Sequence, residues 1–79
     1  MPTILRIFGF RFFFYSNEGN EPQHVHVEKA GSWGKYWIDP VEVAYMNNFT
    51  KQEEKKVDEI VRREQNLFKS KWDEYFGAN

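Results

Sequence analysis

The amino-acid sequence predicts an α+β fold, in which a small antiparallel sheet of four to five strands is covered on one face by a carboxy-terminal helix or by two helices. Two observations lead to this prediction. Residues 1–46 are rich in β-branched and aromatic side chains, whereas residues 50–76 place apolar side chains three and four positions apart. Since 79 residues without internal repeats are expected to form one domain, both segments belong to a single unit, residues 1–79.

The strands of the first segment are separated by turn-forming residues. Gly9 interrupts the first apolar stretch and predicts a hairpin, and residues 16–22 form a polar loop. Gly31-Ser32-Trp33-Gly34 predicts a second turn, and Asp39-Pro40 ends the pairing of the strand before it. The strands are therefore expected over residues 3–8, 11–15, 24–29, 35–38 and, as a short fifth strand or irregular crossing, 41–45.

The helical segment has recognisable ends. Thr50 and Glu53 have the spacing of a capping box, and Gly77 supplies a stop signal. Between them the sequence predicts either one helix from residue 51 to about residue 76 or two helices with a break near Asn66. The apolar positions that recur at helical spacing are Val57, Ile60, Val61, Leu67, Phe68, Trp72, Tyr75 and Phe76.

The run from Pro22 to Val27 holds the only two histidines of the chain, His24 and His26. On a strand, positions i and i+2 point to the same face, so the two imidazoles are expected side by side, with the intervening valine on the other face. Because a helix covers one face only, we expect both histidines to be partly exposed on the opposite face. The helical side chains expected on the covered face are Val57, Ile60 and Val61.

A histidine pair on an open face has three interpretations. The two residues are histidines without chemistry, either on the surface or hydrogen-bonded to a neighbouring loop, or they are metal ligands, or they are a general acid and base. A zinc site needs a third ligand; Glu28, Glu21 and Asp39 are available donors, but none has a diagnostic spacing, and the chain has no cysteine. We therefore expect no tight zinc site in the isolated chain, no metal ligand set and no cofactor.

General acid–base chemistry suits histidine because its pKa lies near neutrality. In this interpretation His24 and His26 act as base and acid on RNA in a metal-independent, ribonuclease-like reaction. Arg11 or Lys35 would stabilise the developing phosphorane charge, with Tyr15 as an auxiliary donor.

The chain contains fifteen aromatic residues, an unusual number for so small a domain. We expect some in the core and others on a surface that meets a protein partner or a second copy of the chain. Trp33, in its predicted turn, and Tyr36 are the expected binding residues, together with the outward member of the Phe12/Phe13 pair. A net charge of −1 does not indicate nucleic-acid binding, and no segment is long and apolar enough for a membrane span.

Five segments, in order along nearly the whole chain, form a recognisable set. They are Met1-Pro2-Thr3-Ile4, Arg11-Phe12-Phe13-Phe14-Tyr15-Ser16-Asn17, Pro22 to Val27, Trp37-Ile38-Asp39-Pro40-Val41-Glu42 and Trp72-Asp73-Glu74-Tyr75-Phe76. Together these segments resemble a small bacterial family known as domain of unknown function 4160. One departure is visible: members often have Pro-Pro-His where this chain has Pro22-Gln23-His24, a change that would loosen the approach to the histidines.

The resemblance implies a cytoplasmic bacterial protein that works in a two-component module of toxin–antitoxin type. It implies a cognate small protein as partner and an RNA target, but it assigns no catalytic residue. The alternative is a non-catalytic protein-binding module without enzymatic activity.

Overall fold

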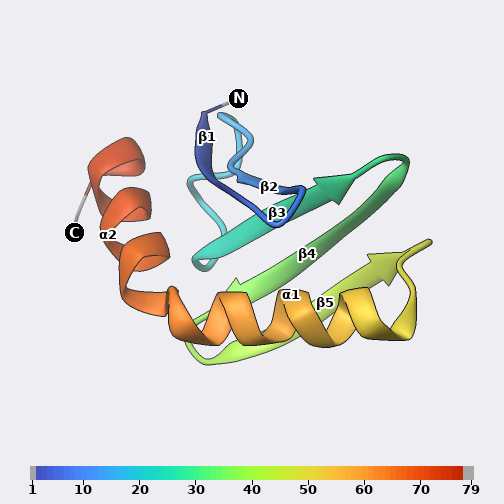
Figure 1. The fold of residues 1–79 in the computed structure, drawn as a ribbon. Helices are drawn as coiled ribbons and strands as arrows, with labels where there is room; N and C mark the ends of the chain where they lie inside the picture. Colours follow the sequence, from blue (N-terminus) through green and yellow to red (C-terminus); the bar gives the residue numbers. More distant parts are fainter. Residues whose placement is uncertain (1, 78–79) are drawn as a thin grey trace.

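The computed structural model describes residues 2–77 and has the predicted α+β architecture (Figure 1). A five-stranded antiparallel sheet is followed by two helices, and the strands lie in the sheet in their order along the chain. Residues 1 and 78–79 of the predicted domain lie outside the described part. The elements are β1 (Thr3–Ile7), β2 (Phe10–Phe13), β3 (His24–Lys29), β4 (Ser32–Ile38), β5 (Val41–Asn47), α1 (Lys51–Arg63) and α2 (Gln65–Phe76).

The turn between β3 and β4 is shorter than the sequence suggested. It consists of Ala30 and Gly31 alone, which have φ angles of 44° and 84°. Two central residues with positive φ make a turn whose twist suits a hairpin. The predicted turn over residues 31–34 is therefore wrong, because β4 already begins at Ser32 and places Trp33 within the strand.

The helical segment forms two helices, which is the second of the two predicted arrangements. The predicted capping box at its start is confirmed: the Glu53 amide donates to the Thr50 hydroxyl over 3.1 Å, and the Thr50 amide donates to the Glu53 carboxylate over 2.9 Å. The break falls at Glu64, two residues before the predicted Asn66, and Gly77 follows the last residue of α2. Within residues 2–77, neither helix is long and apolar enough to cross a membrane.

The core lies between the helices and one face of the sheet, called here the inner face. Val25 and Val27 of β3 share this core with Val57 of α1 and Phe68 of α2. Helix α1 runs along β4 and β5, and α2 turns away from it along the end of the sheet (Figure 1). The aromatic residues divide as expected, since seven of the fifteen are buried: Phe10, Phe12, Phe13, Phe14, Tyr36, Phe68 and Trp72.

The opposite face, called here the outer face, is crossed by rows of directly paired residues. One row, the arginine–tryptophan row, joins all five strands through Arg6, Arg11, Glu28, Trp33 and Asn47. The neighbouring row, the histidine row, joins them through Thr3, Phe13, His26, Lys35 and Tyr45. These pairings decide which candidate residues share a surface.

Candidate functional site

The two histidines lie where strand alternation places them but are not exposed. Val25 and Val27 point into the core, so His24 and His26 point to the outer face. However, His24 is 1% and His26 5% exposed. The expectation of partly exposed imidazoles is therefore wrong, although the expected face is the observed one.

The histidines are buried because the loop between β2 and β3, residues 14–23, folds back over the outer face. Gln23 anchors the loop to α2 by donating to Asp73 over 3.2 Å, and Glu21 accepts from Lys35 of β4 over 3.0 Å. Gln23 is the residue at which this chain departs from the Pro-Pro-His pattern described above. Its side-chain amide connects the loop to α2. Sequence alternation identifies the face of a strand, but it contains no information about a loop that later covers that face.

Aromatic rings complete the enclosure of the histidine pair. The rings of His24 and His26 lie edge to face, with centroids 5.2 Å apart. Trp72 of α2 lies 5.0 Å from the His24 ring, so that one histidine also packs against the second helix. The remaining ring neighbours are Trp37, at 5.6 Å from His24, and Phe13 and Tyr15, at 5.6 and 4.6 Å from His26.

Glu18 is the residue that sequence analysis missed. Its Oε1 atom lies 2.7 Å from Nε2 of His24 and 2.7 Å from Nε2 of His26. The three donor atoms all lie within 4.8 Å of one another. No spacing pattern identifies Glu18, because it belongs to an irregular loop. The only available signal was a carboxylate a few residues before the strand that contains the two histidines.

Two neutral histidines and an ionised Glu18 have too few hydrogens for the contacts of the cluster. The hydrogen-bond geometry requires one more proton. Nδ1 of His24 lies 2.8 Å from the carbonyl oxygen of Pro22 and must donate to it. Nε2 of neutral His26 can donate to Oε1 of Glu18. The contact between Oε1 and Nε2 of His24 then needs a further hydrogen, carried either by a doubly protonated His24 or by Glu18. The cluster is thus arranged to hold one additional proton, which leaves it neutral overall, because that proton balances the charge of the Glu18 carboxylate.

The pKa shifts of the cluster follow from its burial and its hydrogen bonds. Burial lowers the pKa of His26 and outweighs the neighbouring Glu18 carboxylate, which acts in the opposite direction. For Glu18, burial by itself would raise the pKa, but hydrogen bonds with His24 and His26 leave it below its ordinary value. Around neutral pH these shifts favour a neutral His26 that donates to an ionised Glu18.

The carboxylates considered from the sequence as third metal ligands have other partners. Glu28 accepts from Arg11 over 2.8 Å, and Asp39 accepts from Lys69 over 3.0 Å. Glu21 is occupied by Lys35, as described above. None of the three belongs to the histidine cluster.

The other residues predicted to act in catalysis lie around the cluster at increasing distance. Tyr15 packs its ring against His26, and Lys35 is the direct cross-strand neighbour of His26. The Arg11 guanidinium lies 4.3 Å from the Phe13 ring centroid, and the Phe13 ring lies 5.6 Å from the His26 ring. The structure therefore brings the predicted residues together, but it places them around a closed cluster.

The two predicted binding residues have opposite environments. Trp33 is 50% exposed on the outer face. Tyr36 is 3% exposed and donates to Asp58 of α1 over 2.9 Å, and burial with this hydrogen bond raises the pKa of its phenol. The prediction that Tyr36 contacts a partner is wrong, because β4 directs it into the core. The outward member of the phenylalanine pair, Phe13, is also buried at 4% exposure.

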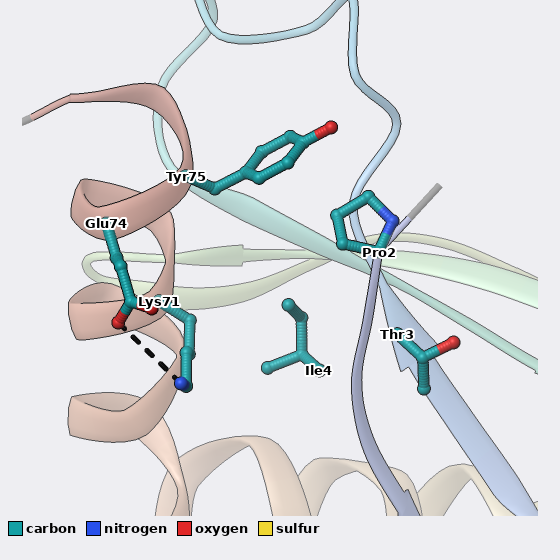
Figure 2. A pocket seen from close by; sticks show the side chains of 6 residues that line it. All are labelled: Pro2, Thr3, Ile4, Lys71, Glu74 and Tyr75. Carbon is teal, nitrogen blue, oxygen red and sulfur yellow. Dashed lines mark ion pairs between the residues drawn. The ribbon is translucent and has the colours of Figure 1, made fainter.

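Three surface hollows lie away from the histidines, and one of them, about 460 Å³, lies between Phe8 and the start of α1. Figure 2 shows the second, about 290 Å³ between the start of β1 and α2, where Lys71 and Glu74 form an ion pair over 3.6 Å beside Tyr75. The third, about 300 Å³, lies on the outer face and is lined by Arg6, Trp33 and other residues of the arginine–tryptophan row and its adjoining turns. Of these hollows, only the one on the outer face contains residues predicted to act in catalysis or binding, Arg11 and Trp33.

These features define an α+β domain with a closed histidine–carboxylate cluster beneath one loop and the exposed arginine–tryptophan row beside it. Comparison with known families matches residues 9–73 to the family described as domain of unknown function (DUF4160), and the chain belongs to that family. No curated protein and no solved structure was found to match the chain. The family assignment agrees with the resemblance seen in the sequence.

Proposed function

We propose that this protein works by binding a small protein partner through the arginine–tryptophan row, as one component of a two-component module of toxin–antitoxin type. The module is what the family resemblance implies. The observation that supports the binding surface is Trp33, half exposed at the edge of a hollow that also contains Arg6. Tryptophan and arginine are the side chains most enriched among residues that dominate interface energies.

The charges of the row indicate the chemistry of the partner. Glu28 lies between Arg11 and Trp33 and is already paired with Arg11. Arg6 is exposed and forms no ion pair with any residue in the range 2–77. A partner that presents a carboxylate to Arg6 and an apolar side chain to Trp33 would satisfy both groups.

The histidines favour the non-catalytic alternative over cleavage of RNA. An acid–base pair must reach the proton that it transfers. Both imidazoles are buried beneath the loop, and both engage Glu18. Action on RNA through His24 and His26, assisted by Arg11, Tyr15 and Lys35, is therefore the competing hypothesis.

The test is co-expression of the tagged protein with the product of the neighbouring gene, followed by measurement of the complex by size-exclusion chromatography and calorimetry. We expect a stoichiometric complex that Trp33→Ala weakens by about 30-fold or more, the effect of losing about 2 kcal/mol at a hot spot. Val43→Ala is the control, because Val43 is 49% exposed but lies opposite Tyr36, away from the row. Equal weakening by both variants, or no complex, would contradict the proposal.

A growth assay distinguishes the proposed binding function from the competing hypothesis of RNA cleavage. We expect expression of the wild type and of the His24→Ala, His26→Ala double variant to affect growth to the same extent. Growth arrest that requires both histidines, with degradation of cellular RNA, would establish the catalytic hypothesis instead. Recovery of RNA rather than protein by the wild type, and its loss in Trp33→Ala, would identify the row as an RNA-binding surface.

A further inference from the structure

We propose that Glu18, His24 and His26 form a binding site for one divalent transition-metal ion, and that Zn²⁺ fits this ligand set. Two imidazole nitrogens and one carboxylate oxygen converge, each nitrogen 2.7 Å from the oxygen. All three atoms lie within 4.8 Å of one another. Both histidines are more than nine-tenths buried, so the donors are held in place by the fold.

The orientation of His24 is that of a metal ligand. A ligating histidine commonly donates its other ring hydrogen to a carbonyl or carboxylate, which fixes the tautomer and directs the free nitrogen towards the ion. His24 makes this bond from Nδ1 to the Pro22 carbonyl over 2.8 Å, leaving Nε2 directed at Glu18. This hydrogen bond is an observation independent of the convergence of the three donors.

The cluster needs only a small adjustment to accept the ion. Zinc lies about 2.0–2.2 Å from nitrogen and oxygen ligands, so tetrahedral ligands are about 3.3 Å apart. The two contacts of 2.7 Å would therefore lengthen by about 0.6 Å. Glu18 can supply this movement, because it lies on a loop and its side chain is 21% exposed. The two Nε2 atoms, which lie within 4.8 Å of each other, would reach the same spacing by rotation of the imidazoles on β3. The ion would occupy the place of the additional proton.

The surroundings suit a transition metal better than calcium or magnesium. Imidazole nitrogen favours zinc, copper, iron and nickel, whereas Ca²⁺ and Mg²⁺ favour sites made of oxygen atoms alone. Three protein ligands leave a fourth position for water or for a further ligand. Four aromatic rings surround the donors and form an apolar shell: Phe13, Tyr15, Trp37 and Trp72.

This inference goes beyond the proposed function and does not depend on it. It also revises the sequence-based expectation of no tight zinc site. That expectation assumed that a third ligand was missing, and Glu18 occupies that position.

The experiment is calorimetric titration of ZnCl₂ into chelator-treated full-length protein, together with thermal unfolding. We expect one ion per chain with submicromolar affinity. At a free zinc concentration of 100 times the dissociation constant, the midpoint of thermal unfolding should rise by about 10 °C or more. Titration with Co²⁺ should produce the visible absorption of a tetrahedral complex.

Two variants locate the site. His26→Ala should abolish binding, and Glu18→Gln should weaken it by about tenfold or more, because it keeps the shape of the side chain but removes the anionic ligand. Glu21→Gln is the control, since Glu21 lies on the same loop but pairs with Lys35. If His26→Ala fails to fold, the comparison of Glu18→Gln with Glu21→Gln decides the question. Absence of binding in the wild type, or equal affinity in Glu18→Gln and Glu21→Gln, would overturn the proposal.

Discussion

Removal of the Glu18 carboxylate tests whether the buried cluster stabilises the fold. In Glu18→Ala, Nε2 of His24 and Nε2 of His26 both lose the oxygen that lies 2.7 Å from each. A buried polar group left without a partner costs about 1–3 kcal/mol. Since the Glu18 side chain is 21% exposed, water will replace part of the loss. We expect the free energy of unfolding to fall by about 2–4 kcal/mol in total.

The measurement is urea unfolding followed by tryptophan fluorescence, at neutral pH and with a chelator present. The denaturant dependence of the unfolding free energy should stay unchanged, so that the shift of the midpoint reports stability alone. Glu21→Ala is the matched control on the same loop; it removes one partly exposed ion pair with Lys35 and should cost about 1 kcal/mol or less. If the two variants lose the same amount, the reasoning about an obligatory buried network is refuted.

Three further predictions concern the sheet and its surface. Gly34→Ala should cost about 1–3 kcal/mol, because the added Cβ would lie 2.9 Å from the carbonyl oxygen of Tyr45. Tyr36→Phe should cost about 1 kcal/mol at pH 7, since it removes the hydrogen bond to Asp58, and this cost should shrink as the pH falls below about 4. In sedimentation experiments we expect the chain to associate with its partner or with a second copy, and Trp33→Ala to shift it towards the monomer.

The sign of the pH effect follows from Asp58. Hydrogen bonds from Arg62, and then from Tyr36, lower the pKa of the Asp58 carboxyl, although burial acts in the opposite direction. A carboxyl with a lowered pKa in the folded state contributes stability above its unfolded pKa and loses it as the pH falls through the folded value. Tyr36→Phe removes part of that contribution. A cost that is equal at pH 7 and pH 3 would contradict this explanation.

Simple observations would contradict the remaining two predictions, on Gly34→Ala and on association. Unfolding measurements that show Gly34→Ala to be as stable as the wild type would mean that β5 moves to accommodate the methyl group. A chain that sediments as a monomer at high concentration, with and without the partner, would show that the aromatic surplus serves the core alone.

Local patterns predicted much of the fold. The capping box at Thr50, the limits of the strand over residues 24–29 and the alternation of histidines with valines depend on neighbouring residues, and all three are observed. The turn at Ala30 and Gly31 was placed wrongly because alanine rarely adopts a positive φ, so the composition of residues 31–34 suggested a turn there instead.

The candidate site was less predictable because it depends on contacts between distant segments. The face of β3 could be inferred, but its burial could not, since the covering loop is held by Gln23 on Asp73 of α2, fifty residues further along the chain. The role of Glu18 depends on the same loop. Trp33 was predicted to bind a partner because it was placed in a turn, and Tyr36 because aromatic residues dominate interface energies. Strand alternation instead places Tyr36 in the core and Trp33 on the outer face.

The two proposed sites are neighbours, yet they can be tested separately. Trp33 lies two residues before Lys35 on the same face of β4, and Lys35 is paired across the strand with His26. Among residues 2–77, no pair of contacting aromatic rings joins Trp33 to the rings that enclose the histidines. Trp33→Ala should therefore weaken partner binding by about 30-fold or more and leave zinc affinity unchanged. Glu18→Gln should weaken zinc binding by about tenfold or more and leave partner affinity unchanged. If either variant lowers both affinities by a similar factor, the loop over residues 14–23 and the arginine–tryptophan row form one coupled surface, because the two sites share β3 and β4.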